Sequence, residues 1–300
     1  MVTISEEWLT ICGGCELSLL DIGEPLIDLL EKIEFVHIPV LMDWKYYGQE
    51  AERDSIELPE ADVGILTGGI RDEEQKHLAK EMRDKVGTLI AMGACATQGG
   101  IPSLANMYTM DDMRETVFKN MKSTEPGEVP SDNLPAPLDR VYAVEEVVNV
   151  DLKIPGCPPA SWHIAEAITS LLEGTSWSLP EVSECDYCPR ERKMKADIQL
   201  KRNLEPIPDE KRCMLELGYL CLGPVTLGGC GGAQKTPRCI AGNMPCEGCY
   251  GPIREGANPM VDMMGALSSI GIDPSSVLDR RATFNRFIGA KNRLRPLPGR

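Results

Sequence analysis

The sequence has no long apolar run. Of its 300 residues 42 % are hydrophobic, but no stretch approaches the roughly 18 to 20 consecutive apolar residues that a membrane-spanning helix needs. The N-terminus also lacks a basic segment followed by an apolar one, and it has no twin arginine, so we expect no export signal. The sequence therefore predicts a protein without a membrane span that works in the cytoplasm.

Basic residues are fewer than acidic ones. The chain has 31 Lys and Arg against 46 Asp and Glu, for a net charge of −15, which argues against a general nucleic-acid binder. The exception is the last stretch, residues 280–300, which holds no acid. It is interpreted either as a solvated tail or as a strap that docks on an acidic partner surface. Its basic residues are Arg280, Arg281, Arg286, Lys291, Arg293, Arg295 and Arg300.

Histidine is rare, whereas cysteine is abundant. His37, His77 and His163 are isolated, and none has the spacing of a zinc-binding pair. The twelve cysteines include CxxC pairs, in a chain that is long for a disulfide scaffold. In a reducing compartment this pattern indicates metal held by thiolate, which leaves iron–sulfur clusters and cysteine-rich zinc sites as the candidates.

The first half of the sequence alternates short apolar segments with helical ones. This alternation predicts an α/β fold, a doubly wound parallel sheet with right-handed crossovers. The stretch 102–137 interrupts it, and we interpret that stretch as a surface insertion with one short helix. Strand patterns cover 2–9, 35–41, 63–66, 88–92 and 147–154, and helical patterns cover 16–32, 72–85 and 160–173.

The composition and the periodicity of the sequence change after about residue 176. Eight of the twelve cysteines lie between Cys185 and Cys249, among short glycine-rich pieces without a regular period, and only 259–271 has a helical pattern. Such a segment needs metal ligation to organise it. We therefore predict two domains: a sheet domain over 1–176 and a smaller, irregular iron–sulfur domain over 177–300.

The other four cysteines follow predicted strands. Cys12 and Cys15 form a CGGC motif after the first strand, Cys95 follows the strand at 88–92, and Cys157 follows the strand that ends at 154. Because the carboxyl ends of parallel strands share one edge of a sheet, these thiols are expected to converge there. The neighbouring glycines would let the backbone approach a bulky cluster closely.

The eight later cysteines begin and end with CxxC pairs, each of which can clamp two corners of one metal centre. The simplest partition gives two sets of four, so that the twelve thiols divide into three sets with none left over. This arithmetic favours three 4Fe–4S clusters over three zinc sites, although no ferredoxin-type CxxCxxCxxxC run is present. The two later sets are Cys185, Cys188, Cys213 and Cys221, and Cys230, Cys239, Cys246 and Cys249.

Four motifs make the chain resemble the small, electron-transfer subunit of a nickel–iron hydrogenase over essentially its whole length. They are WLTICGGCELSLLD at 8–21, GACATQGG at 93–100, IPGCPP at 154–159 and the eight-cysteine array. The first three are also similar to the cluster-bearing subunit of respiratory complex I, whereas the array is typical of hydrogenases.

The resemblance implies a flavodoxin-like first domain and three 4Fe–4S clusters, which are called proximal, medial and distal in this family. It also implies that the nickel–iron centre and the splitting of dihydrogen belong to a large partner subunit, so this chain holds no catalytic residue. Glu16, beside Cys15, is interpreted either as a carboxylate at a helix start or as a proton relay near that partner. The proximal set is Cys12, Cys15, Cys95 and Cys157, the distal set is Cys185, Cys188, Cys213 and Cys221, and the medial set is Cys230, Cys239, Cys246 and Cys249.

Two departures place the chain near the cytoplasmic enzymes of methanogens. Many periplasmic members have a histidine where this chain has Cys185, and many lack the cysteine found here as Cys239. The resemblance is therefore strongest to the viologen-reducing hydrogenase, which implies a small iron–sulfur acceptor subunit and heterodisulfide reductase as partners. The alternatives that stay open are the small subunit of a deazaflavin-reducing hydrogenase, a complex I-like module and a non-redox zinc scaffold.

Overall fold

The computed structural model describes residues 1–42, 44–123, 125–196, 199–202, 205–208 and 211–298. The chain forms two compact units: the sheet unit, residues 1–161 with 287–300, and the cysteine unit, residues 162–286. The sequence placed one boundary at 176/177 instead, and that division into domains stays a prediction. None of the helices in the described ranges is both long enough and apolar enough to cross a membrane.

Five parallel strands form the centre of the sheet unit. Their order is β2-β1-β3-β5-β7, the flavodoxin-like doubly wound order, so the predicted α/β class is confirmed. Leu89 and Ile90 are neighbours in β5 that point to opposite faces, and neither is exposed, because the sheet is covered on both sides. The strands are β1 (Val2–Trp8), β2 (Ile33–His37), β3 (Ala61–Thr67), β5 (Val86–Met92) and β7 (Leu152–Ile154).

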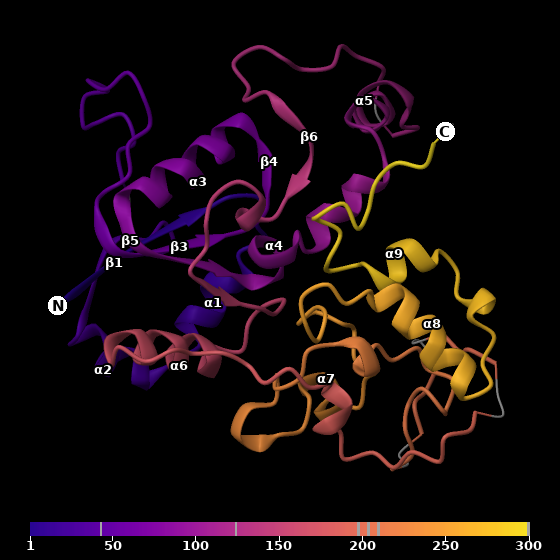
Figure 1. Ribbon diagram of the computed structural model, residues 1–300. Helices are drawn as coiled ribbons and strands as arrows, with labels where there is room; N and C mark the ends of the chain where they lie inside the picture. The colour runs from indigo at the N-terminus through magenta and orange to yellow at the C-terminus, as the bar shows by residue number, and fades with distance from the viewer. Residues whose placement is uncertain (43, 124, 197–198, 203–204, 209–210, 299–300) are drawn as a thin grey trace. The chain divides into compact units, whose positions relative to one another are not determined.

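Helices lie on both faces of this sheet, with α3 on one side and α1 and α2 on the other (Figure 1). The start of α3 is capped by the Asp72 carboxylate, which accepts a hydrogen bond from the N–H of Gln75. The single helix predicted over 16–32 is wrong: Gly23 has a φ of 74°, and a second helix begins after it, with Pro25 in its first turn. The helices are α1 (Gly14–Leu20), α2 (Glu24–Leu30), α3 (Glu73–Lys85) and α4 (Gly93–Gln98).

A second, antiparallel sheet of two strands did not stand out in the sequence, because both strands are short and partly polar. It pairs β4 (Ile70–Asp72) with β6 (Pro137–Tyr142). The strand predicted over 147–154 is reduced to β7, and a short helix, η3 (Val144–Glu146), precedes it. The predicted insertion holds η1 (Ile101–Met107), α5 (Met110–Glu115) and η2 (Thr116–Asn120), and neither α5 nor η2 buries a residue.

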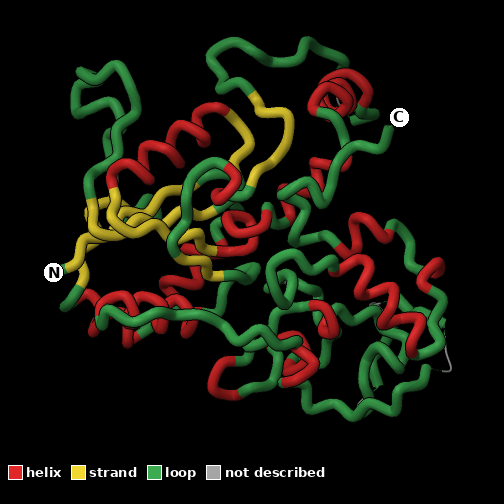
Figure 2. The backbone as a smooth tube through the Cα atoms, in the orientation of Figure 1, coloured by secondary structure: helices red, strands yellow, loops and turns green. Residues whose placement is uncertain are grey.

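The cysteine unit is mostly loop, as the sequence predicted (Figure 2). Its core combines Met214, Tyr219, Met263 and Leu267 with buried cysteines rather than with a regular layer of helices or strands. The helical pieces are α6 (Ser161–Leu172), η4 (Glu184–Asp186), η5 (Gly223–Val225), η6 (Gly232–Gln234), α7 (Arg238–Ala241), α8 (Pro259–Ser269), η7 (Pro274–Ser276) and α9 (Arg280–Phe284).

The end of the chain returns to the sheet unit and packs beside α4. Ile288 forms a bridge with Gly100, and the N–H of Ala290 donates to the carbonyl of Gln98 at 3.2 Å. The N–H of Gly289 donates to the hydroxyl of Ser103 at 2.9 Å. Ile288, Ala290 and Leu294 are buried, so this part of the basic end is not a solvated tail. Arg300 lies outside the described residues.

Candidate metal centres

The structure brings the proximal set together at the carboxyl edge of the sheet. Cys12 and Cys15 follow β1, Cys95 lies in α4 directly after β5, and Cys157 follows β7. Burial and then the charges of Cys157 and Cys12 raise the pKa of Cys95 to about 12. Burial also raises the pKa of Cys15, with the charges of Glu16 and of the other three thiols adding to it. Four bare thiolates would therefore repel one another here, and positive charge between them would relieve the repulsion.

Two glycines keep the space around these sulfurs open. A Cβ on Gly93, where φ is +90°, would lie 2.4 Å from Sγ of Cys15. A Cβ on Gly100, where φ is +55°, would lie 2.4 Å from Sγ of Cys95. Both the backbone conformation and the close approach require glycine. The proximal set thus sits in a cradle that any side chain at either position would fill.

Acidic residues are buried beside the proximal set. Glu16 lies in the first turn of α1 and is 1 % exposed, and neither of its carboxylate oxygens has a hydrogen-bond partner among the described residues. Glu6 in β1 is fully buried, and burial followed by the charge of Glu16 raises its pKa well above the usual range. Sequence reasoning missed Glu6, because an acid within a strand pattern gives no sign of what covers it. The proton relay through Glu16 stays a prediction.

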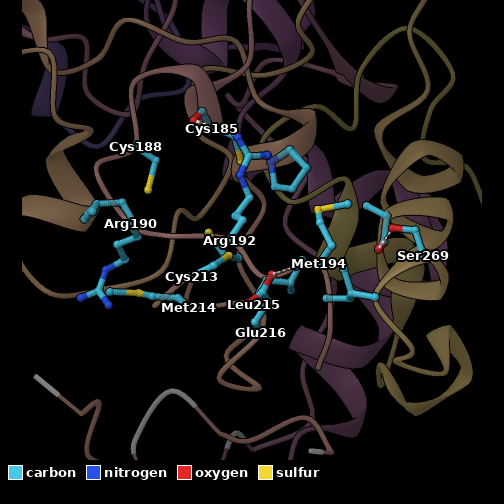
Figure 3. Close-up of a pocket in the computed structure, with 15 residues that line it drawn as sticks. Cys185, Cys188, Arg190, Arg192, Met194, Cys213, Met214, Leu215, Glu216 and Ser269 are labelled. Carbon is cyan, nitrogen blue, oxygen red and sulfur yellow. Dashed lines mark hydrogen bonds between the residues drawn. The ribbon is translucent and has the colours of Figure 1, made fainter. Parts of the chain in front are cut away.

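The four cysteines of the distal set line one cavity of about 200 Å³ in the cysteine unit (Figure 3). Burial followed by the charge of Cys221 raises the pKa of Cys185 to about 12, against the opposing charge of Arg192. Gly223 leaves room at the wall, since a Cβ there would lie 3.3 Å from Sγ of Cys185 and 3.6 Å from Sγ of Cys221. Sequence reasoning missed Arg190 and Arg192, which line the same cavity.

The four cysteines of the medial set lie in α7 and in the loops on either side of it. Burial raises the pKa of Cys246, and the charges of Cys221, Cys249 and Cys239 add to it. Burial, then the side chain of Glu184, raises the pKa of Cys230, and Cys249 contributes as well. The backbone N–H of Arg238 donates to Sγ of Cys230 at 3.3 Å. These contacts bring all four cysteines of the set into one neighbourhood.

A buried histidine supports the medial set from α6. Nδ1 of His163 lies 3.1 Å from the hydroxyl of Tyr250, the residue after Cys249, and both side chains are 2 % exposed. The His163 ring also lies 5.5 Å from the ring of Trp177 and 5.8 Å from that of Tyr250, measured between centroids. No sequence pattern indicates this role, because His163 stands alone in a helical segment.

The donors in all three sets fit iron–sulfur clusters. Every set consists of thiols, and backbone N–H groups donate to several of the sulfurs, those of Cys221 and Cys230 among them, as they do around protein-bound clusters. Among the described residues, no three Cys, His, Asp or Glu side chains have the arrangement of a site for a single metal ion. The cavity lined by the distal set has room for a group larger than one ion.

Comparison with known iron–sulfur subunits gives the class of protein to which this sheet order and these thiols belong, the nickel–iron hydrogenase small subunits. The family model described as NADH ubiquinone oxidoreductase, 20 Kd subunit, matches residues 12–171. A chain of the solved NAD+-reducing nickel–iron hydrogenase in its H2-reduced state superposes with a TM-score of 0.54 at 32 % identity, over 60 % of this chain and 95 % of that chain. The nickel–iron–selenium hydrogenase of Desulfovibrio vulgaris Hildenborough shares the fold, with a TM-score of 0.54 at 19 % identity over 85 % and 95 % of the two chains.

Curated relatives cover nearly the whole chain. A subunit of the vhu F420-non-reducing hydrogenase of Methanococcus voltae is 38 % identical over 277 residues, 92 % of this chain and 91 % of that protein. The corresponding subunit of the F420-non-reducing hydrogenase of Methanothermobacter thermautotrophicus is 38 % identical over 89 % and 84 % of the two chains. The chain belongs to the small subunits of nickel–iron hydrogenases of the F420-non-reducing type, and is thus a component of an oxidoreductase.

Proposed function

We propose that this chain is the electron-transfer subunit of its hydrogenase and carries three 4Fe–4S clusters, one on each cysteine set. Electrons from dihydrogen, which is oxidised at a nickel–iron centre on the large subunit, enter at the proximal set, pass the medial set and leave from the distal set. The observation that supports this proposal is that Cys185, Cys188, Cys213 and Cys221 line one cavity, while cysteines of the other two sets lie close enough to raise one another's pKa.

The chain's own residues have a defined part in this function. Bound clusters supply one-electron chemistry at low potential. The thiolates hold them, the backbone N–H groups of Arg238 and Cys246 stabilise charge on the sulfurs, and the buried positions of Cys221 and Cys230 exclude water. A hydrogen bond between the distal and medial sets supports their order as consecutive steps.

The partners follow from the same reasoning. We expect a large subunit with the nickel–iron centre, a small iron–sulfur acceptor subunit and heterodisulfide reductase, all in the cytoplasm. The relatives support an acceptor other than the deazaflavin coenzyme, since they belong to F420-non-reducing hydrogenases. The complex I-like alternative is disfavoured because the matched family model ends at residue 171, before the eight later cysteines.

Metal analysis of the native complex, purified without oxygen, tests the proposal. The small subunit should carry about 12 iron and about 12 sulfide, four of each per cluster, and the complex should reduce methyl viologen with dihydrogen. Separated from the large subunit, the chain should take up no dihydrogen. Stoichiometric zinc would establish the scaffold alternative, only four irons would remove two of the clusters, and dihydrogen uptake by the single chain would contradict the electron-transfer assignment.

A further inference from the structure

A patch of positive charge lies beside the distal set, in a chain whose net charge is −15. Residues 190–195 contain four basic residues and one acid. We define the basic surface as the exposed residues Arg192, Lys193, Met194, Lys195 and Lys211. Lys211 joins the others because its carbonyl accepts a hydrogen bond from the N–H of Glu191 at 2.7 Å.

The basic surface is held in place by a buried acid. Glu216 is 1 % exposed, and its carboxylate accepts hydrogen bonds from the N–H of Lys193 at 2.8 Å and from that of Met194 at 2.6 Å. Arg212 donates from Nε to Glu216 at 3.3 Å and from Nη2 to the carbonyl of Lys195 at 2.7 Å. Glu216 and Arg212 thus fix the backbone of this loop through hydrogen bonds.

Met194 is held outward at a cost in backbone strain. Its φ is 56°, in the left-handed region that disfavours side chains with a Cβ, and 62 % of the residue is exposed. Glycine at this position would avoid the strain, and it would leave no large apolar side chain in water. Flexible methionine side chains are typical of surfaces that adapt to a protein partner.

The basic surface adjoins the thiols from which electrons would leave. Arg190 and Arg192 line the cavity together with the distal cysteines, and Figure 3 shows both arginines among them. Nη2 of Arg192 donates to the carbonyl of Cys185 at 3.4 Å. A protein that accepts electrons here must approach within a short distance of this cavity, so its surface would meet these charges first.

We propose that the basic surface is the docking site of the protein electron acceptor, and that this acceptor presents an acidic surface around an apolar recess for Met194. The proposal rests on the proposed function, in which the distal set is the exit. Opposite charges on the two surfaces accelerate encounter and fix orientation, and this effect weakens as salt rises. The lysines attract the acceptor at long range, while the side chain of Met194 packs into the apolar recess once the two surfaces meet.

Steady-state kinetics of the hydrogenase purified with its large subunit and without its small acceptor subunit test the proposal, with dihydrogen as the electron donor. The protein acceptor used in place of that subunit is an acidic ferredoxin with two 4Fe–4S clusters, and the dye is methyl viologen. Lys193→Glu with Lys211→Glu should raise KM for the ferredoxin about tenfold and reverse its salt dependence, while turnover of the dye stays as in the wild type. The matched control is Arg71→Glu with Lys80→Glu, which changes net charge equally at exposed positions of the sheet unit and should leave KM unchanged.

Met194→Gly separates docking from loop structure. Glycine relieves the positive φ, so a purely structural loop would lose nothing, whereas a docking loop loses its apolar contact and KM for the ferredoxin should rise several-fold. The proposal is overturned if KM for the ferredoxin is the same in all variants. It is also overturned if that KM rises equally in the control variant, or if the lysine variant loses turnover of the dye. A wild-type enzyme that reduces the dye but not the ferredoxin would also overturn it and leave the proposed function intact; failure with the dye would overturn the proposed function itself.

Discussion

The backbone N–H of Cys246, in the medial set, donates a hydrogen bond to Sγ of Cys221, in the distal set, at 3.2 Å. Cys246 also lies within the electrostatic influence of Cys221, whose charge, after burial, raises the pKa of the Cys246 thiol. In the proposed arrangement Cys246 would ligate the medial cluster with its side chain and stabilise a sulfur of the distal cluster with its backbone. The two proposed redox sites would then not be independent.

This relationship separates two substitutions of Cys246. Both Cys246→Ser and Cys246→Pro remove the thiolate and should damage the medial cluster. Only proline also removes the N–H, and loss of a hydrogen bond to sulfur disfavours the more negative, reduced state, so the distal potential should fall in that variant alone. EPR-monitored redox titration of the distal cluster checks this; the same distal potential in both variants would contradict the coupling.

If the medial set holds a cluster as proposed, Cys239 should determine its type. It is the second residue of α7, in the first helical turn, where proline is tolerated because no intrahelical N–H bond is lost. Cys239→Pro should leave Cys230, Cys246 and Cys249 to hold a 3Fe–4S cluster of higher potential. The oxidised variant should show the EPR signal of such a cluster and the wild type should lack it; a full signal in the wild type would mean that Cys239 is no ligand.

Arg192 should raise the potential of the distal cluster. A cation beside the thiolates favours the reduced cluster, which carries one more negative charge. Because Arg192 is exposed and therefore screened, we expect Arg192→Gln to lower the potential by tens of millivolts, where about 59 mV is a tenfold change for one electron. Arg192→Lys keeps the charge and serves as the control in the same titration. A potential that moves equally in both variants would point to lost packing instead of lost charge.

The glycine cradle makes the proximal cluster sensitive to one methyl group. Gly93→Ala would place a Cβ 2.4 Å from Sγ of Cys15 at a positive φ, so iron content should fall from about 12 to about 8 per chain, the count for two remaining cubanes. Gly265→Ala is the control: this glycine lies within α8 with nothing within 4 Å of the added atom. It should keep all its iron and stabilise the chain by roughly 0.5–1 kcal/mol. Full iron in Gly93→Ala would remove the cradle argument.

His163 makes stability depend on pH. Burial lowers the pKa of His163 below its usual 6.5, so the unfolded chain takes up a proton below that pH and the folded chain does not. Stability should therefore fall as pH drops below 6.5, by up to about 1.4 kcal/mol per pH unit. Thermal unfolding of the loaded protein at pH 7.5 and 5.5 checks this, and His163→Gln should reduce the difference in Tm. Tyr250→Phe, which strips Nδ1 of its partner, should cost about 1–3 kcal/mol at both pH values.

The sheet could be predicted because its signals are local. The apolar runs of β3 and β5 show directly in the sequence, and the rule that parallel strands end at one edge brought Cys12, Cys95 and Cys157 together. The break at Gly23 was missed because the apolar periodicity continues through it. Contacts that depend on the path of the chain, such as those of His163 with Tyr250 and of Glu216 with Met194, leave no pattern that spacing alone reveals.

The return of residues 287–294 to the sheet unit has a consequence for synthesis. The segment that packs against the residues after Cys95 lies more than 270 residues further along the chain than Cys12 and Cys15. The surroundings of these two early cysteines are therefore complete only once residues 287–294 have been made and have packed against residues 98–103. A chain cut before residue 287 would lack this support, so insertion of a cluster at the proximal set should depend on a segment far from it in the sequence.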